Sequence, residues 1–313
     1  MTGIGIDRRL LILFAAVLVL AALVGYVAGR RHPHAPPREP VLTASIGGVL
    51  LNAPPQWRVS SAPEIPGFAV RHAVALAPAG NGSQAGLLAG TLPLAQGTPL
   101  PSQLLARLSQ RPTTAVVGLQ EAQAYRYTDL RIAGYERSLA VYVVPNPGGD
   151  PTALACYASP GQASQLLACE RSVAALRLAG QAQTYDLAPQ PEYAQRLRAA
   201  IAALDLQRSA LRGQMATGAS PGAARSAAAQ LSRVFAATAA ALSGLEPTLA
   251  TGQAQAVLSG AILRARAAYA LLATAAGRRS EAGFAAARGQ VERAEAGVDR
   301  ALEGFALLGY QAA

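Results

Sequence analysis

The sequence predicts a mixed α+β protein with an N-terminal transmembrane helix, a small antiparallel-sheet α+β domain and an all-α four-helix up-and-down bundle. Three observations predict this class. Residues 10–28 are apolar and uncharged, residues 41–179 alternate strand patterns with turn signals, and from about residue 180 strands give way to alanine-rich helical patterns. The predicted segments are a cytoplasmic stub at 1–9, the anchor at 10–28, a Pro/Arg-rich linker at 29–40, the α+β domain at 41–179 and the bundle at 180–313.

The apolar run at 10–28 has the length of a membrane span. Its nineteen residues would reach about 28 Å as a helix, close to the hydrocarbon thickness of a bilayer. A cleaved signal peptide is the alternative, but it has a shorter apolar core and small residues at its cleavage site. Tyr26 stands at the exit of this run. We therefore expect a retained anchor.

The two cysteines indicate the compartment. Arg8 and Arg9 precede the anchor and two arginines follow it, so charge alone leaves the orientation nearly balanced. Cys156 and Cys169 are the chain's only cysteines, and an even count at close spacing in an exported chain predicts one disulfide. Two buried thiols are the alternative. A disulfide favours a single-pass cell-membrane protein with residues 29–313 outside the cytoplasm.

The linker at 29–40 contains two of the chain's three histidines. His32 and His34 stand among prolines and arginines, with no cysteine or carboxylate cluster beside them. A segment of this composition cannot bury a core and is expected to be an extended spacer. Solvated side chains are the simpler interpretation of these histidines, and no metal site is predicted.

The pattern at 41–179 predicts strands interrupted by two helices. Turn signals stand at 80–83 and 145–150. The last helix places Leu166, Cys169, Val173 and Leu176 at spacings of three and four, so the disulfide would join it to the last strand. The strands are predicted at 41–51, 56–59, 68–76, 86–94, 123–130, 138–144 and 152–157, and the helices at 101–109 and 162–178.

Four helices are predicted after residue 180, at 191–216, 221–245, 247–276 and 280–310. The first three open with proline, which a first helical turn tolerates because its N–H would be unpaired there. Ser220 and Ser280 are the expected N-caps of the second and fourth helices. Short connections between helices of similar length favour antiparallel neighbours.

Two helices carry clear apolar stripes. A heptad seam is expected on the fourth helix, in which large residues alternate with mostly small ones. The first helix has a matching stripe. The seam residues are Phe284, Val291, Val298 and Phe305 with Ala287, Ala294, Ala301 and Leu308, and the stripe is Tyr193, Leu197, Ile201, Leu204, Leu211 and Met215.

The α+β segment resembles a known group of proteins. The turn at 145–148, the TALACY segment at 152–157 and the Cys169-Glu170 pair are similar to ectodomains of uncharacterised actinobacterial single-pass membrane proteins. The order of strands and helices looks like the PsbP-like fold. That resemblance implies a binding or assembly module rather than an enzyme, and it transfers no functional residues to this chain.

Motifs for catalysis are missing from the sequence. There is no G-x-S-x-G, S-x-x-K or H-E-x-x-H, and the glycine-rich stretch at 80–86 lacks the lysine of a phosphate-binding loop. His72 stands within an apolar alternation and is expected to be an ordinary strand residue. The carboxylates of the α+β domain are scattered singly at Glu121, Asp129, Glu136, Asp150 and Glu170. We therefore predict no enzyme, no cofactor and no metal.

Acidic and basic residues alternate on the last helix. Glu292, Glu295, Asp299 and Glu303 stand among Arg288, Arg293 and Arg300 at helical-neighbour spacings. An exposed, solvated helix face is the expected arrangement.

The charge distribution and the architecture together suggest a role. The chain carries a net charge of +10, with thirteen arginines against eight acidic residues in 189–313. A basic bundle outside the membrane suits a protein partner, anionic lipid or a wall polymer, whereas dispersed arginines and few aromatic residues argue against nucleic acid. We expect a membrane-anchored envelope protein that acts as a non-enzymatic interaction or assembly module. The alternative is a sensor or ligand-binding ectodomain for an envelope lipid or glycan.

Overall fold

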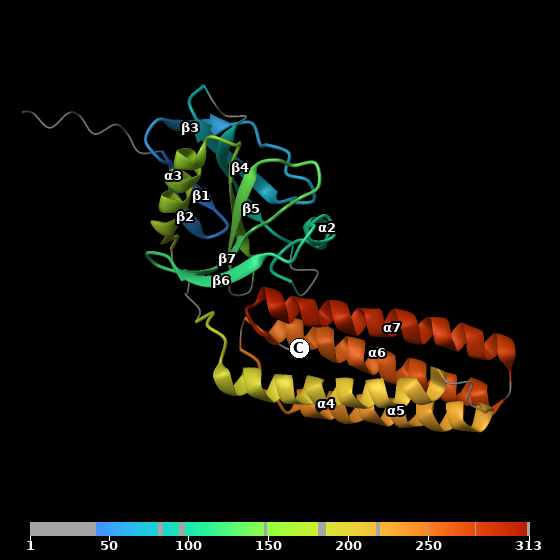
Figure 1. Ribbon diagram of the computed structural model, residues 1–313. Coiled ribbons are helices and arrows are strands. Elements are labelled where there is room, and N and C mark those ends of the chain that lie inside the picture. The colour runs from blue at the N-terminus through green and yellow to red at the C-terminus, as the bar shows by residue number, and fades with distance from the viewer. Residues whose placement is uncertain are drawn as a thin grey trace, which may run out of the picture. The chain divides into compact units, whose positions relative to one another are not determined.

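The computed structural model describes residues 42–80, 84–93, 98–146, 149–180, 186–216, 220–248, 250–278 and 280–311 (Figure 1). They belong to one compact unit that begins at Leu42. The predicted stub, anchor and linker at 1–40 lie outside the described residues, as do parts of the two predicted turns, at 81–83 and 147–148. Across the described part of the chain, two antiparallel sheets and six helices give the mixed α+β class that the sequence predicts.

A seven-stranded antiparallel sheet is the centre of the N-terminal part, with strand order β3-β4-β5-β9-β8-β7-β6. The longest pairings join β9 to β5 and to β8, so the last of this sheet's seven strands in sequence lies in its middle. The strands are β3 (Trp57–Ser60), β4 (Arg71–Pro78), β5 (Ala85–Thr91), β6 (Thr113–Gly118), β7 (Gln123–Thr128), β8 (Ser138–Val144) and β9 (Thr152–Ala158).

A second, three-stranded sheet corrects the prediction of one long strand at 41–51. It consists of β1 (Thr43–Ile46), β2 (Val49–Asn52) and β10 (Arg177–Leu178) in the order β1-β2-β10. The chain reverses at Gly47 and Gly48, whose φ angles are +53° and +86°. Glycine reaches this left-handed region without a Cβ penalty, which makes a two-residue hairpin turn possible inside an apolar run.

Three further elements differ from the prediction. β6 was not expected, although it forms one edge of the large sheet. The helix predicted at 101–109 is a single turn, α2 (Ser102–Leu105). The helix predicted at 162–178 ends earlier, as α3 (Ala163–Ala174), because the chain then adds β10 to the small sheet.

Alternation along the strands gives the large sheet two buried faces. On one face Leu87, Leu154 and Cys156 pack with Cys169 and Val173 of α3. Cys156 and Cys169 are joined by a disulfide with a Cα–Cα distance of 5.8 Å, in agreement with the prediction that the bond ties the helix to the last long strand. The other face carries a row of apolar and aromatic residues that includes Leu88, Tyr125, Tyr127, Val141 and Tyr157.

His72 lies at an irregularity in β4. The register with β5 shifts between Arg71 and Val74, and His72 has a φ of +52°. Its side chain is exposed. The alternation predicted through this residue is therefore interrupted by a bulge, which turns the imidazole toward solvent.

Four long helices form the C-terminal bundle: α4 (Pro191–Ala216), α5 (Pro221–Ser243), α6 (Gly252–Gly277) and α7 (Glu281–Leu307). Ser220 and Ser280 are N-caps, and their side chains accept hydrogen bonds from Ala223 N at 3.3 Å and Gly283 N at 3.1 Å. The closest backbone packing joins each helix to the next in sequence: α4 to α5, α5 to α6, and α6 to α7.

The start of α6 differs from the prediction. Pro247 does not begin the helix, because Thr248 and Thr251 form a compact turn in which each hydroxyl accepts from the other residue's backbone N–H. Helical geometry begins only at Gly252. The alanines of α5 and α6 that face each other allow these two helices to pack closely.

The predicted apolar stripes form the bundle core. Val291, Val298 and Phe305 of α7 are buried, and Leu197, Ile201 and Leu204 of α4 are buried opposite them. By length and composition, α6 is the one helix in the described ranges that would be able to cross a membrane. Its apolar side chains Leu258, Ile262 and Leu272 lie in the bundle core. A core helix of a globular bundle has the same length and apolar composition as a membrane span.

Candidate functional site

The sheet and the bundle meet at two tyrosines of β7. Tyr127 is fully buried, and its hydroxyl donates a 2.7 Å hydrogen bond to the carbonyl oxygen of Leu307 in the last turn of α7. Tyr125 lies beside it, with ring centroids 6.5 Å apart. Burial raises the pKa of both phenols well above 10. The apolar residues around this junction belong to the same core as those of the bundle, so the two parts share a hydrophobic interior.

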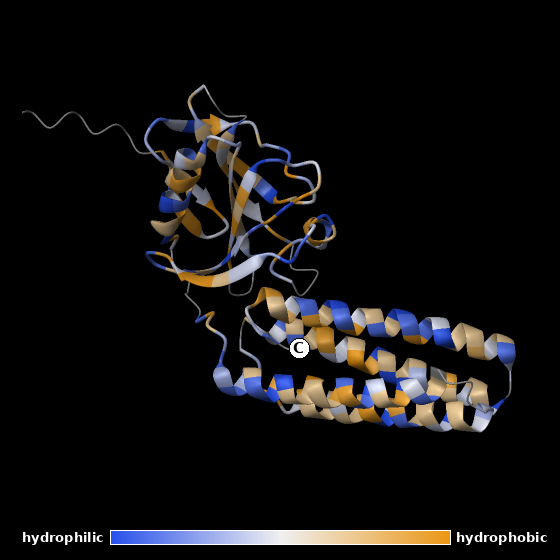
Figure 2. Cartoon of the chain, in the orientation of Figure 1, coloured by the Kyte–Doolittle hydropathy of each residue, from blue (hydrophilic) through white to orange (hydrophobic). Residues whose placement is uncertain are grey.

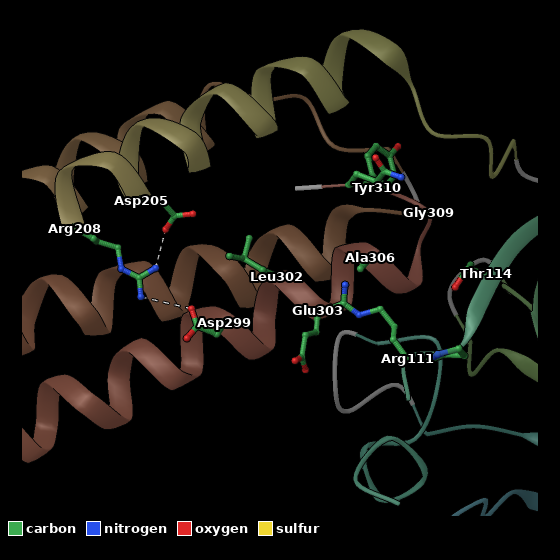
Figure 3. A pocket seen from close by; sticks show the side chains of 12 residues that line it. Arg111, Thr114, Asp205, Arg208, Asp299, Leu302, Glu303, Ala306, Gly309 and Tyr310 are labelled. Atoms are coloured by element: carbon green, nitrogen blue, oxygen red, sulfur yellow. Dashed lines mark hydrogen bonds and ion pairs between the residues drawn. The ribbon is translucent and has the colours of Figure 1, made fainter. Parts of the chain in front are cut away.

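A pocket of about 500 Å³ opens beside this junction (Figure 3). The segment that leads into β6 forms one wall, while α4, α7 and the chain's last described residues form the others. Its volume lies in the range of small-ligand sites, about 300–1,000 Å³. The lining residues are Arg111, Pro112, Thr114, Asp205, Arg208, Asp299, Leu302, Glu303, Ala306, Gly309, Tyr310 and Gln311.

Arg208 is a buried cation of the pocket wall, held in place by ion pairs. It is only 7% exposed, which is unusual for arginine. Its guanidinium lies 3.0 Å from a carboxylate oxygen of Asp205 and 3.5 Å from one of Asp299 (Figure 3). Its Nε lies 3.5 Å from Glu295 but makes no hydrogen bond. Arg208 thereby lies between the carboxylates of Asp205 and Asp299 and limits their orientations.

Behind Arg208, a buried ionic network fills the seam between α4 and α7. Glu295 is 8% exposed and forms ion pairs with Arg208 and Arg212. It also accepts a 2.6 Å hydrogen bond from the hydroxyl of Tyr269 on α6. Burial, and secondly this hydrogen bond, raise the pKa of Tyr269. The prediction of a wholly solvated acidic face on α7 is therefore wrong at Glu295, which points into the bundle.

Two further charges of the pocket have no partner in the described part of the chain. Arg111 and Glu303 are exposed, and neither forms an ion pair or hydrogen bond with another described residue. Figure 3 shows Arg111 reaching from the sheet side toward α7, which contributes Glu303 and Ala306 to the same pocket. The pocket thus combines a satisfied ionic centre with one unpaired cation and one unpaired carboxylate.

A separate network holds α3 on the sheet. Arg126 donates to Glu170 at 2.7 Å and to the hydroxyl of Tyr142 at 3.0 Å, while Tyr142 donates to Glu170 at 2.9 Å. Burial, and secondly the bond to Glu170, raise the pKa of Tyr142 to about 12. Because Glu170 follows Cys169, this network and the disulfide fix the same turn of α3.

Four of the five carboxylates that the sequence singled out in the α+β domain, all but Glu136, have separate structural partners among the described residues. Glu121 accepts from Arg177 at 3.1 Å, and Asp129 accepts from the Thr113 hydroxyl at 2.7 Å. Within the described ranges, no group of three or more His, Cys, Asp or Glu residues is arranged to hold a metal ion. His32 and His34 lie outside those ranges.

The outer surface of α5 and α6 is the second candidate. Neither helix contains an acidic residue, and their charges are Arg225, Arg233, Arg264 and Arg266. On α6, Leu263 is 48% and Leu271 52% exposed, and small residues surround them. Figure 2 shows hydrophobic residues along this helix. We call the exposed residues Gln253, Ala256, Leu263, Ala267, Ala270, Leu271 and Thr274 the α6 face.

Sequence reasoning missed both the pocket and the α6 face. The pocket joins residues near 111, 205, 300 and 310, a combination that only the tertiary fold creates. The absence of acidic residues from two successive helices was, however, visible in the sequence.

Comparison with protein-family models finds no match, and comparison with curated proteins finds none either. The fold and these surfaces define an antiparallel α+β domain that shares its core with a helical bundle.

Proposed function

We propose that this chain is a membrane-anchored, extracytoplasmic and non-enzymatic interaction module, whose α6 face binds an amphipathic helix of a protein partner. The observation that supports it most strongly is the exposure of Leu263 and Leu271 on a helix that carries no acidic residue. Single exposed leucines are ordinary on protein surfaces, but two leucines eight positions apart on one helix, with alanines between them, form a patch that a partner can cover.

The small residues of the face suit a helical partner. Ala267 lies between Leu263 and Leu271, and Ala256 and Ala270 extend the same side of α6. Small side chains let a second helix approach closely, with the leucines packing into its grooves. Arg264 and Arg266 at the margins would meet acidic residues on that helix, because complementary charge guides association and orientation.

The predicted anchor restricts where such a partner would lie. Residues 29–40 are twelve proline- and arginine-rich residues, which would span about 37 Å at 3.1 Å per residue. The folded unit would then begin within that distance of the membrane, within reach of another membrane-bound protein. Raised local concentration would allow a modest interface to form a stable complex.

A paired set of variants tests this proposal. The full-length chain with a C-terminal tag is cross-linked in its native cells and recovered with its partners. We expect one defined protein with the wild type, and at least a tenfold loss of it with Leu263→Gln/Leu271→Gln. Leu206→Gln is the matched control, because Leu206 is 70% exposed on α4, away from the α6 face. Equal recovery with both variants would refute the α6 face as the docking site.

Flotation with vesicles separates a protein partner from a lipid surface. The wild-type protein is mixed with vesicles of anionic phospholipid and with neutral vesicles. Our proposal predicts no difference between the wild type and Leu263→Gln/Leu271→Gln in this assay. Binding to anionic vesicles that the double substitution abolishes would replace the protein partner by the membrane surface.

The second candidate function is ligand binding, and the junction pocket is the observation that favours it. The sequence suggested an envelope lipid or glycan as the ligand, and the charged lining of this pocket suits a small polar compound better than a lipid.

A further inference from the structure

We propose that the pocket at the sheet–bundle junction binds a small zwitterion, namely an amino acid or short peptide with a free ammonium and a free carboxylate group. This site is formed by α4, α7 and the segment before β6, so the inference does not depend on the α6 face. It rests on the two unpaired charges, on the buried arginine between two carboxylates and on the size of the pocket.

The ammonium group has a defined place. Glu303 has no partner among the described residues, and Asp299 on the preceding turn of the same helix lines the same pocket. Arg208 contacts one oxygen of Asp299 at 3.5 Å and one of Asp205 at 3.0 Å, which leaves acceptor capacity on both carboxylates. An ammonium group supplies three donors and would bridge Glu303 and Asp299.

The carboxylate group has a different place. Arg111 enters the pocket from the sheet side and has no acidic partner in the described ranges. A guanidinium presents a planar fork of donors that a carboxylate accepts in a bidentate manner. Arg208 is less suited to this role, because it is already held by Asp205, Asp299 and Glu295.

The remaining wall favours a small apolar side chain on the ligand. Leu302, Ala306 and Pro112 contribute apolar surface, and Tyr310 is buried at the edge of the pocket. The net charge of the lining is negative, with three carboxylates and two arginines, in a chain whose net charge is +10. The sign of the charge in the pocket is therefore opposite to that of the whole chain. A negative lining disfavours purely anionic ligands and favours a ligand that carries a positive group.

Isothermal titration with four probes tests this assignment on the full-length protein in detergent. The probes are alanyl-alanine, its N-acetyl derivative, its C-terminal amide, and putrescine. We expect saturable binding of alanyl-alanine at concentrations up to about 10 mM, where a Kd of 1 mM is nearly saturated. Acetylation and amidation should each weaken binding about tenfold, and putrescine should bind more weakly than the dipeptide.

Two single variants assign the two ends of the ligand. In Glu303→Gln, acetylation of the probe should cost little further affinity, because its ammonium group has already lost its acceptor. In Arg111→Gln, amidation should cost little while acetylation still matters. Glu292→Gln on the exposed side of α7, where Glu292 pairs with Arg288, should bind all four probes like the wild type. Loss of discrimination at only the matching end of the ligand is a result that general destabilisation would not produce.

Three results would overturn the inference. The wild type would show no saturable binding of alanyl-alanine in that range, or putrescine would bind more tightly than the dipeptide, or Glu303→Gln and Arg111→Gln would leave the discrimination between probes unchanged. None of them bears on the α6 face, because the loss of a partner in Leu263→Gln/Leu271→Gln is measured separately.

Discussion

Replacement of Glu295 by alanine should destabilise the bundle far more than its position on a charged helix suggests. The substitution removes the carboxylate that pairs with Arg208 and Arg212 and accepts the hydrogen bond of Tyr269. Breaking a buried ion pair from one side costs about 3–5 kcal/mol, because the remaining charge stays buried without its partner. We expect the lower end, about 3 kcal/mol, since Arg208 keeps Asp205 and Asp299.

The same helix supplies the control. Glu292 pairs with Arg288 at 3.4 Å, and both side chains are largely exposed. An exposed pair of this spacing contributes only about 0.3–0.5 kcal/mol. Glu292→Ala and Glu295→Ala make the same chemical change in one helix, so they change helix propensity equally. The difference between their free energies of unfolding therefore measures the effect of burying the carboxylate.

Urea unfolding followed by circular dichroism measures both variants. Removing both ends of the Arg208–Glu295 pair, as in Arg208→Met/Glu295→Met, should cost less than Glu295→Ala alone, since no unpaired buried charge then remains at that contact. If Glu295→Ala changes the free energy of unfolding by no more than about 0.5 kcal/mol, like Glu292→Ala, the network does not stabilise the bundle.

Three further predictions concern the junction, the disulfide and the tyrosines. Tyr127→Phe should lower the free energy of unfolding by about 1–2 kcal/mol, because a buried carbonyl oxygen in the last turn of α7 loses its donor; an unchanged urea midpoint would contradict this. Cys156→Ala/Cys169→Ala should cost about 3 kcal/mol, because the bond closes a loop with a sequence separation of 13; stability equal to that of the wild type would contradict it. Tyr142 and Tyr193 each have a pKa raised to about 12, mainly by burial. Since their folded-state pKa exceeds the unfolded value near 10, their stabilising contribution is complete below pH 10 and is lost as the pH rises toward 12. Phenolate absorbance, compared with that of Tyr142→Phe and Tyr193→Phe, should show no ionisation of either residue in the folded protein until the pH approaches 12, and ionisation of either residue near pH 10 in the folded protein would refute the assignment.

Local pattern was sufficient for much of the fold. The apolar period of α4 and α7 and the serine caps of α5 and α7 are local features, and the helices begin where these features predict. The start of α6 was mispredicted because a proline is compatible with a first helical turn but does not require one. The hydroxyls of Thr248 and Thr251 instead satisfy the backbone groups of a turn before the helix.

The errors in the sheets have a different origin. β6 is an edge strand of six residues, TTAVVG, whose apolar residues are adjacent instead of alternating, so its alternation is weak in the sequence. The β1–β2 hairpin depends on the backbone freedom of Gly47 and Gly48 within a continuous apolar run. The Gly47-Gly48 pair is a hairpin signal in the sequence, but the apolar residues on both sides of it read as one continuous strand.

The candidate site depends on tertiary structure. Periodicity places Glu295 and Glu303 on a charged helix, but it does not tell which of them faces α4. The burial of Arg208 within the apolar stripe of α4 decides that question, since a buried guanidinium needs carboxylates across the seam. Arg111 joins the pocket only because the sheet docks its tyrosines on the end of α7.

Site-specific photo-cross-linking tests the central claim most directly. A photoreactive amino acid replaces Ala267, between the two exposed leucines of the α6 face, or Leu206 on α4 as the control, and the cells are irradiated in their native state. We predict a discrete protein adduct from position 267 and none from position 206. Lipid adducts alone at position 267, or the same protein adducts from both positions, would contradict the account of the α6 face as a specific docking surface.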